Sequence, residues 1–456
     1  MPAESATSSP VRQPVAGQNQ QPEIHLSHRW KWSSQQAISF LMQQGVENPD
    51  VISLAAGLVD PASLPVAETR QAVQELLAVP ARGRQALQYG TTAGVEPLRR
   101  QLVQHLARLE NVEPDSLGIT PQQIVVTTGS QQLLSVLSEI LFDPGDICLV
   151  AAPTYFVYLG VLEGVGARAV PVQTDNDGMR MDDLERQLGL LEQAGELDRV
   201  RMIYVVSSYE NPSGVSLSAD RREQLVEISR RWSRENRILV LEDAAYRELR
   251  YDGPELPSVW SFDRDRSSVI LAQTFSKSFA PGLRVGFGVL PQELVAPFCD
   301  RKGNEDFGSA SFCQHLLAQV LAQGQYQSHV EEVRRACRIK RDALLQAAEQ
   351  YLAPLEGVSW LQPHGGLYVW ATVPEHISTG FDSPLFQHAV QQTGVMYVPG
   401  ELFYAGEPAG RRRCQMRLSF GVEEPDTIRE GIRRLAESIR AITSYQSVTS
   451  YQSVTS

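Results

Sequence analysis

Two hydrophobic patterns alternate along the chain from about residue 92 to residue 292. Stretches with leucines at helical spacing, of which 98–109 is the clearest, are separated by short runs rich in β-branched residues. These runs are apolar almost throughout, as strands buried on both faces should be. The alternation predicts a mostly parallel, seven-stranded sheet flanked by helices, with strands at 124–128, 147–152, 167–173, 200–207, 238–242, 268–275 and 285–290.

The pattern changes beyond residue 308. Helical periodicity runs over 313–352 and again over 426–442, and shorter strand-like runs lie at 367–373 and 416–420. Helices segregated from a few strands are typical of an α+β unit. The expected fold class is therefore α/β, with a large sheet domain and a smaller α+β domain.

The expected boundaries use composition as well as periodicity. The first residues are rich in Pro, Gln, Ser and Ala, and the last residues repeat Tyr-Gln-Ser-Val-Thr-Ser, so both ends are expected to be disordered. We expect five parts: a disordered head at 1–24, an N-terminal segment joining the small domain at 25–75, the large domain at 76–304, the small domain at 305–442 and a disordered tail at 443–456.

Charge and hydropathy limit what the chain binds. Its 456 residues carry 41 Lys plus Arg against 53 Asp plus Glu, with a net charge of −12 and a pI near 5.3. A nucleic-acid or anionic-membrane surface needs a basic footprint, so the expected ligand is small and no nucleic-acid partner is predicted. No stretch approaches the roughly 20 apolar residues of a membrane helix and no signal-peptide pattern begins the chain, which predicts a cytoplasmic protein without a membrane partner.

Cysteine and histidine usage gives no metal site. The five cysteines are odd in number and far apart, without a CxxC pair, and the eight histidines form no HExxH. Dispersed cysteines among apolar neighbours are typical of buried thiols in a reducing compartment. The sequence therefore predicts free cysteines and no bound metal.

Lysine is scarce, so any chemistry that needs a primary amine has only four candidates. Lys31 lies between two tryptophans, Lys302 is expected in a charged loop and Lys340 on a basic helix face. Lys277 instead follows a predicted buried strand. The search for a reactive amine therefore turns to Lys277.

Lys277 has the surroundings of a reactive lysine. Thr274 and Ser276 precede it, Pro-Gly follows, and Arg284 lies seven residues on. Burial and nearby cations lower the pKa of an amine and make it a nucleophile, which suits a Schiff base with an aldehyde cofactor. Thr274, Ser276 and Arg284 are candidates to bind a phosphate, the guanidinium holding two oxygens in a fork. The alternative is an ordinary surface lysine whose amine reaches solvent.

A second phosphate signal lies between a strand and a helix. Gly129, Ser130 and Gln131 come after the strand predicted at 124–128 and before a helix predicted at 133–142. Free backbone amides and the positive end of the helix dipole meet at such a point, and glycine lets the anion approach closely. Ser130 and Gln131 are candidates for the other side of the phosphate site, although an ordinary strand-turn-helix with a serine cap explains the same residues.

Several further motifs, in one fixed order, resemble the pyridoxal-phosphate (PLP)-dependent aminotransferases of fold type I, class I/II, the branch that includes 2-aminoadipate and kynurenine aminotransferases. The resemblance covers roughly residues 30–440 and implies that the large domain binds PLP. The motifs are Tyr89-Gly90-Thr91-Thr92-Ala93-Gly94 with Leu98-Arg99, Tyr209-Glu210-Asn211-Pro212-Ser213-Gly214, Asp243-Ala244-Ala245-Tyr246 and Met416-Arg417-Leu418-Ser419-Phe420.

The resemblance implies roles for residues at successive strand ends, where open α/β sheets bind ligands. Asp243 would keep the pyridine nitrogen protonated, Asn211 and Tyr246 would hydrogen-bond the phenolic oxygen, and Tyr155 would stack on the ring. Lys277, Asp243 and Tyr246 are the expected catalytic residues. Each position also has an ordinary explanation: a common turn sequence at Asn211, a helix cap at Asp243, and core aromatics at Tyr155 and Tyr246.

The implied reaction exchanges an amino group between an L-amino acid and a 2-oxo acid, with 2-oxoglutarate as the acceptor, by a ping-pong mechanism. Lys277 would hold the cofactor and, once freed by the substrate amine, carry the proton from the substrate Cα. Arg417 would grip the α-carboxylate in a fork, assisted by Asn211, while Gly57 and Tyr404 would line the substrate mouth. A surface arginine, a turn glycine and a packing aromatic are the ordinary explanations.

The resemblance also implies a homodimer in which Tyr89 reaches the phosphate of the other subunit's cofactor. Departures from the family leave substrate choice open: Glu210 replaces the usual glutamine, and residues 244–245 and 308–311 also differ. Another PLP-dependent reaction on the same fold, such as β-elimination or decarboxylation, stays an alternative. A PLP-sensing regulator would require a DNA-binding domain, and the 24-residue head shows neither a helix-turn-helix pattern nor a basic patch.

Overall fold

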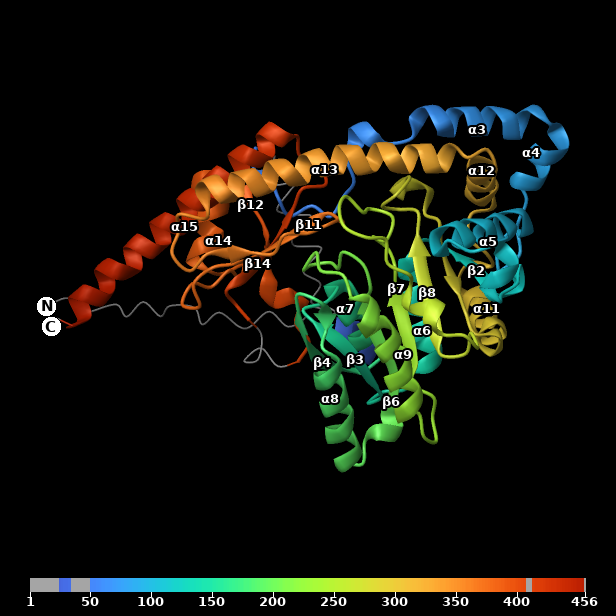
Figure 1. The fold of residues 1–456 in the computed structure, drawn as a ribbon, viewed down its shortest axis with the longest axis horizontal. Coiled ribbons are helices and arrows are strands. Elements are labelled where there is room, and N and C mark those ends of the chain that lie inside the picture. Colours follow the sequence, from blue (N-terminus) through green and yellow to red (C-terminus); the bar gives the residue numbers. More distant parts are fainter. Residues whose placement is uncertain (1–23, 34–49, 407–411, 455–456) are drawn as a thin grey trace, which may run out of the picture.

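The computed structural model describes residues 24–33, 50–406 and 412–454 of the chain. Its largest part is an eight-stranded sheet in the order β2-β9-β8-β7-β6-β3-β4-β5, with helices on both sides (Figure 1). The central strands pair in parallel, whereas β9 runs antiparallel to both of its neighbours. The strands are β2 (Ile124–Thr127), β3 (Ile147–Ala152), β4 (Arg168–Asp175), β5 (Gly178–Met179), β6 (Val200–Val206), β7 (Leu239–Asp243), β8 (Val269–Thr274) and β9 (Gly286–Val289).

The predicted α/β class with a large, mostly parallel sheet is confirmed, but the predicted number of seven strands was wrong by one. Each predicted strand is present within two residues of its expected bounds. The additional strand, β5, has only two residues and pairs antiparallel with the end of β4. A run of that length carries no periodicity, so a pattern-based prediction cannot detect it.

Alternate residues of the strands face two separate cores. In β2, Val125 points into one core, and Ile124 and Val126 point into the other. The first core lies under α6, α7 and α11 and continues into the small domain, and the second lies under α5, α8, α9, α10 and α12. These helices are α5 (Glu96–Glu110), α6 (Ser130–Leu141), α7 (Phe156–Gly164), α8 (Met181–Gln193), α9 (Ala219–Trp232), α10 (Val259–Phe262), α11 (Gln292–Asp306) and α12 (Ser311–Ala322).

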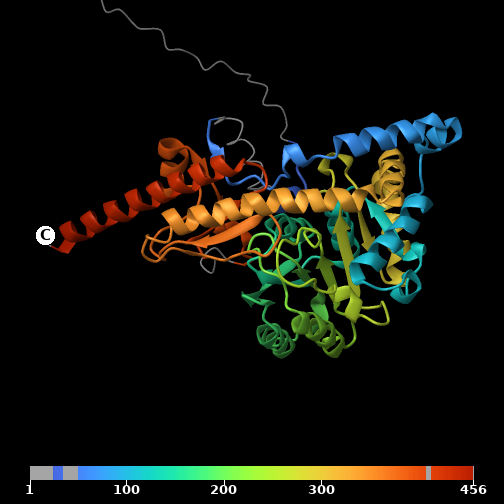
Figure 2. The same cartoon turned by 45° about the horizontal axis from the view of Figure 1, so that its top comes forward.

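The small domain is built on an antiparallel sheet in the order β10-β11-β14-β13. The long helix α13 runs from α12 to this sheet and packs on α15 (Figures 1 and 2). The helical pattern predicted over 313–352 is thus two helices, because Gly324 takes a left-handed φ of +73° between them. The elements are β10 (Ser359–Trp360), β11 (Tyr368–Thr372), β13 (Val398–Pro399), β14 (Gln415–Ser419), α13 (Gln325–Tyr351), α14 (Pro384–His388) and α15 (Pro425–Val454).

The N-terminal segment contacts both domains. After α1 (His28–Ser33), its strand β1 (Ile52–Ser53) pairs in parallel with β12 (Val395–Met396) of the small domain. Its helix α3 (Val66–Ala78), which leads into α4 (Pro80–Ala86), packs on α12. Residues between β1 and α3 are therefore held over the junction of the two domains.

The two predicted disordered ends have different outcomes. The head at 1–24 lies outside the described residues, apart from its last residue. The tail expected to be disordered from residue 443 instead continues α15 as far as Val454, where the helix projects away from the body (Figures 1 and 2). No Gly or Pro follows Gly431 in this helix, so nothing in the local sequence ends it.

Candidate active site

A cavity opens at the carboxyl ends of β6, β7 and β8, where open α/β sheets bind ligands. Every residue predicted to bind the cofactor lines it, with the exception of Tyr89. The segments singled out in the sequence therefore meet at one place, although they span more than 150 positions along the chain. The lining residues are Gly129, Ser130, Gln131, Tyr155, Val206, Asn211, Asp243, Ala245, Tyr246, Thr274, Ser276, Lys277 and Arg284.

One end of the cavity has the features of an anion site. Gly129, with a φ of +72°, precedes α6, and no side chain in the described part of the chain caps the helix amides. A Cβ on Gly129 would lie 2.8 Å from Nη2 of Arg284, and one on Gly286 would lie 2.5 Å from the amide nitrogen of Ser130. Arg284 also donates to the hydroxyl of Ser276 (3.5 Å). The serine-cap explanation is not what the structure shows, because the cap position belongs to Gly129, and the free amides and guanidinium suit a phosphate.

Asp243 is the last residue of β7 and lines the cavity. Its carboxylate accepts hydrogen bonds from the hydroxyl of Tyr204 (3.0 Å) and the amide of Ala245 (3.1 Å). Burial raises the pKa of Asp243 to about 6. A buried carboxylate whose hydrogen-bond partners here are a phenol and an amide is suited to a cationic ligand group, and the protonated nitrogen of a pyridine ring is such a group.

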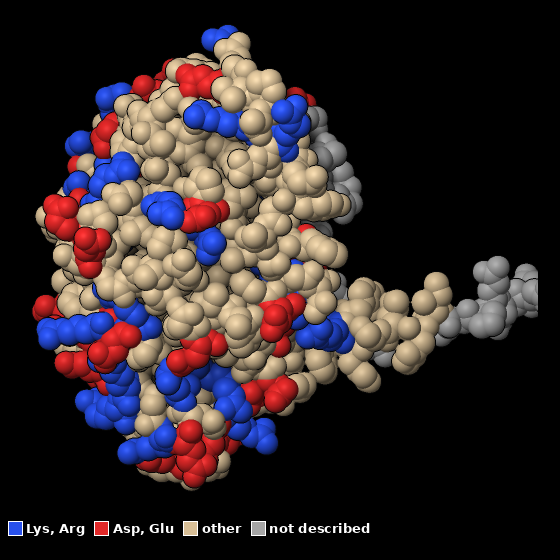
Figure 3. Space-filling model, turned by 90° about the vertical axis from the view of Figure 1, so that its right-hand side faces the viewer, with Lys and Arg blue, Asp and Glu red and all other residues tan. Residues whose placement is uncertain are grey.

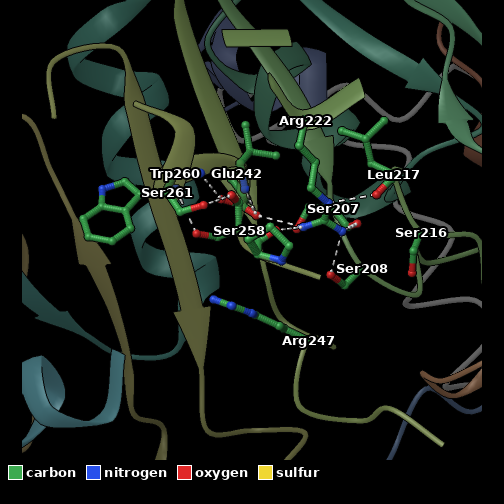
Figure 4. A network of polar contacts seen from close by, with 12 residues as sticks. Ser207, Ser208, Ser216, Leu217, Arg222, Glu242, Arg247, Ser258, Trp260 and Ser261 are labelled. Atoms are coloured by element: carbon green, nitrogen blue, oxygen red, sulfur yellow. Dashed lines mark hydrogen bonds and ion pairs between the residues drawn. The ribbon is translucent and has the colours of Figure 1, made fainter. Parts of the chain in front are cut away.

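Glu242, one residue earlier, points to the other side of β7 and belongs to a separate polar network (Figure 4). Its carboxylate accepts from two main-chain amides at the start of α10 and lies 3.8 Å from the guanidinium of Arg222, which is fully buried. Arg222 in turn donates to the carbonyl of Ser207, just beyond the end of β6. This network fixes the loop that leads to Asn211 in the cavity.

Lys277 follows β8, and its amine donates to the carbonyl of Gly57 (2.6 Å) from the N-terminal segment. The loop expected for Lys302 was wrong, because Lys302 lies in α11 and pairs with Asp306 (2.8 Å). Lys340 lies on a helix, α13, as expected, but its amine is buried against Asp60 (3.1 Å). Both amines are held in ion pairs, whereas the Lys277 amine faces the cavity.

Arg417 joins the small domain to the site. Its guanidinium donates to the side-chain oxygen of Asn211 (2.8 Å) and to the carbonyl of Ala55 (2.8 Å), and it lies 4.3 Å above the ring of Tyr368. Only 4% of Arg417 is exposed, which rules out the surface-arginine explanation. Gly57 lies beside it, since a Cβ there would be 3.9 Å from the guanidinium.

Four predicted site residues do not line the cavity: Gly57 and Arg417 contact the lining residues Lys277 and Asn211, whereas Tyr89 and Tyr404 have other surroundings. Tyr89 is 87% exposed, and Tyr404 is buried with its hydroxyl bonded to Gln415 (2.5 Å). Two tyrosines at the site were missed, namely Tyr204 and Tyr368. Both lie in apolar strands, where an aromatic looks like any core residue, and no signal in a single sequence separates them from the core.

Metal and membrane features were also expected to be absent. Among the described residues, Glu68, His329 and Glu332 bring potential ligand atoms within 4.8 Å of one another, and none of them lines the cavity. The prediction of no bound metal stays a prediction. In the described part of the chain, no helix is long and apolar enough to cross a membrane.

Comparison with known proteins agrees with this geometry. The family model "Aminotransferase class I and II" matches residues 49–435. The chain belongs to this family. It is 35% identical to aromatic-amino-acid aminotransferase 1 of Thermococcus litoralis over 87% of this chain and 89% of that protein, and 31% identical to the 2-aminoadipate transaminase of Thermus thermophilus over 87% and 92%.

Solved structures place the fold in the same family. A multiple substrate aminotransferase from Thermococcus profundus superposes with a TM-score of 0.82 at 34% identity, covering 92% of this chain and 98% of that one. An α-aminoadipate aminotransferase from Thermus thermophilus, complexed with N-(5'-phosphopyridoxyl)-L-leucine, gives 0.78 at 28% identity, with the same coverage. The protein is a PLP-dependent aminotransferase of fold type I.

Proposed function

We propose that the protein transfers the amino group of an L-amino acid to a 2-oxo acid, with 2-oxoglutarate as the acceptor, by a ping-pong mechanism through Lys277. The observation that carries this proposal is the convergence of an amine and a buried carboxylate on one cavity, with a buried guanidinium bonded to Asn211 in its lining. Bound PLP supplies an aldehyde for the amine and a ring that accepts electrons. Relatives named for aromatic amino acids and 2-aminoadipate make these the donors to test first.

Each residue has a separate task in this proposal. Amides at the start of α6, with Arg284 and Ser276, hold the phosphate, and Asp243 keeps the pyridine nitrogen protonated. Arg417 binds the α-carboxylate and so orients the Cα–H bond. The Lys277 amine, once freed by the substrate amine, would take the proton from Cα and deliver it to the carbon that was the cofactor's aldehyde carbon.

The position of Arg417 favours transamination over decarboxylation. A buried arginine that is already fixed by Asn211 and Ala55 holds a carboxylate in place, which opposes its loss as carbon dioxide. A β-lyase keeps the same carboxylate contact, so only chemistry separates it from an aminotransferase. A lyase forms its 2-oxo acid without an amino acceptor.

A homodimer and a cytoplasmic location complete the proposal. Leu87, Tyr89 and Phe307 are 72%, 87% and 79% exposed, and the face on the side of α4 and α5 has a broad area without charged side chains (Figure 3). Exposed apolar side chains and an uncharged area of this kind suit contact with a second copy of the chain. The five free cysteines fit a reducing compartment.

The experiment is to trap the cofactor and follow the half-reaction. Borohydride treatment of the PLP-loaded enzyme should attach the reduced cofactor to the peptide that contains Lys277, as read by mass spectrometry. Lys277→Ala should lose this label and reduce turnover by at least about a thousandfold. Amino acids added singly should convert bound PLP to its amine form, and 2-oxoglutarate should reverse it. A label elsewhere, or 2-oxo acid formed steadily without an acceptor, would overturn the proposal.

A further inference from the structure

A buried tyrosine without a role in the proposed function, Tyr368, contacts both halves of the site. It begins β11 in the small domain, and only 1% of it is exposed. Its hydroxyl lies 3.2 Å from the hydroxyl of Tyr246, and its ring lies under the guanidinium of Arg417. One side chain therefore touches a residue that faces the cofactor and a residue that faces the substrate carboxylate.

The electrostatic surroundings make Tyr368 the better donor of the two tyrosines. Burial raises the pKa of Tyr246 well above its ordinary value. Burial acts in the same direction on Tyr368, but the positive charges of Arg417 and Lys277 outweigh it and lower the pKa of Tyr368. The more acidic hydroxyl forms the stronger hydrogen bond as a donor.

Proton counting gives the same direction. Tyr246 has one hydroxyl proton, and the phenolic oxygen of the cofactor is an acceptor. If Tyr246 donates its proton to that oxygen, it can only accept from Tyr368. The hydrogen bond between the two tyrosines then points from Tyr368 to Tyr246 and leaves the Tyr246 proton directed at the cofactor.

Gly57, in the N-terminal segment, leaves space for the Tyr368 hydroxyl only because it has no side chain. A Cβ on Gly57 would lie 2.8 Å from the Tyr368 oxygen, and the carbonyl of Gly57 accepts from the Lys277 amine at 2.6 Å. Any side chain at position 57 would therefore displace the hydroxyl. The glycine that was expected at the substrate mouth also defines the position of Tyr368.

We propose that Tyr368 is a positioning residue with two separable parts. Its hydroxyl holds the Tyr246 hydroxyl as a donor to the phenolic oxygen of the cofactor, and its ring holds the guanidinium of Arg417 in the plane that receives the carboxylate. The inference rests on the proposed function, because it assigns the cofactor and the carboxylate to these neighbours.

Two variants separate the parts. Tyr368→Phe removes only the hydroxyl. The pH midpoint of the bound cofactor's visible absorbance band should therefore rise by roughly half a unit or more. The kcat should fall about 3- to 10-fold, and KM for the amino acid should stay within twofold. The midpoint rises because the phenolic oxygen loses support for its negative charge. Tyr368→Leu also removes the ring, so KM should rise about 3- to 10-fold in addition. An unchanged midpoint in Tyr368→Phe overturns the hydroxyl's role, and an unchanged KM in Tyr368→Leu overturns that of the ring.

A double-mutant cycle tests whether Tyr368 acts through Tyr246. The midpoint shift of Tyr246→Phe combined with Tyr368→Phe should equal that of Tyr246→Phe alone, since the second hydroxyl then has nothing to orient. Additive shifts would show that Tyr368 acts on the cofactor by another route and would contradict the inference.

Gly57→Ala gives an independent test in which Tyr368 itself is not substituted. It should raise the midpoint as Tyr368→Phe does, and adding Tyr368→Phe to it should produce no further shift. A normal midpoint in Gly57→Ala would contradict the inference. Failure of the inference is distinguishable from failure of the proposed function: in the first case the wild-type holoenzyme still transaminates, and in the second it does not.

Discussion

Asp243 and Glu210 both carry buried carboxyl groups, but their surroundings favour different protonation states at neutral pH. Asp243 has a phenol and an amide as donors and lines the cavity, where the proposed function assigns it to the pyridine nitrogen. Glu210 accepts only from the hydroxyl of Ser213 (2.8 Å), and its other oxygen has no partner among the described residues. Burial raises the pKa of Glu210 to about 8, so it is protonated at neutral pH. A neutral acid of this size explains how glutamate occupies the position where the family has glutamine.

Glu210→Gln should therefore stabilise the protein, and more so at higher pH. The folded-state pKa of Glu210 lies above its unfolded value of about 4.5, so its contribution is fully present below pH 4.5 and is lost as the pH rises towards 8. The wild-type free energy of unfolding should fall relative to Glu210→Gln by at most about 1.4 kcal/mol per pH unit in this window. Urea unfolding at several pH values between 5 and 8 measures the difference.

Glu430→Gln is the matched control. Its surface arginine partners lower the pKa of Glu430 to about 2, so it is ionised in both states throughout this window. The difference in free energy of unfolding between Glu430→Gln and wild type should be independent of pH between 5 and 8. A Glu210→Gln difference that is equally flat would show that Glu210 is ionised in the folded protein.

At this scale the sequence identified residues by motif and missed those without one. Lys277 follows a strand and lies between two serines, and Asp243 ends a strand and is followed by two alanines. Such a change of residue type after an apolar run is visible in the sequence. Tyr368 and Tyr204 lie within apolar strands, and their roles depend on which hydroxyl or guanidinium the fold places beside them. Packing partners from distant segments are not encoded in local spacing.

At the scale of elements, two consecutive residues of β7 point to opposite faces of the large sheet. Side chains alternate across a strand, so Asp243 faces the cavity while Glu242 faces Arg222 and α10. Because Arg222 also donates to the carbonyls of Ser207 and Leu217, it ties α9 to the loop after β6 (Figure 4). The position of Asn211 in the cavity thus depends on a buried arginine outside it.

Arg222→Met should destabilise the protein by about 3–5 kcal/mol, because it leaves the Glu242 carboxylate without its buried partner. PLP affinity should also fall, since the loop before Asn211 loses its anchor. The neighbouring Arg221→Met is the control: Arg221 pairs with the partly exposed Asp175 (2.6 Å) and should cost less than about 1 kcal/mol. Urea midpoints and PLP titrations of both variants provide the measurement, and equal midpoints would refute the role of the buried network.

Element prediction succeeded where burial on both faces made strands uniformly apolar, as in β3, whose bounds were predicted without error. Element prediction failed where a strand was very short or where the backbone angle of one residue ended a helix. The two-residue strand β5 carries no period, and the break before α13 depends on the left-handed φ of Gly324. The tail was judged by its polar composition, whereas helix continuation from α15 decided its backbone.

In the whole molecule, the active site uses residues from outside the large domain. The N-terminal segment supplies one group, and the exposed face around Tyr89 is proposed to supply another to a second subunit. The segment pairs with the small domain through β1 and supplies the Gly57 carbonyl to Lys277. Tyr89 is 87% exposed and does not line the cavity of its own chain. Its proposed task belongs to the cavity of a second subunit.

Mixed dimers should show whether Tyr89 acts across the subunit boundary. Lys277→Ala and Tyr89→Ala homodimers should both be strongly impaired, because each lacks one of the two residues at every site. A heterodimer of the two, co-expressed with different tags and purified through both, has one site in which Lys277 and Tyr89 are both intact. It should therefore recover about half of the wild-type activity. The control is the heterodimer of Lys277→Ala with Arg284→Ala: both residues line one cavity of the same chain, so every site stays defective and no recovery is expected. Equal activities of the two heterodimers would place Tyr89 outside the partner's site.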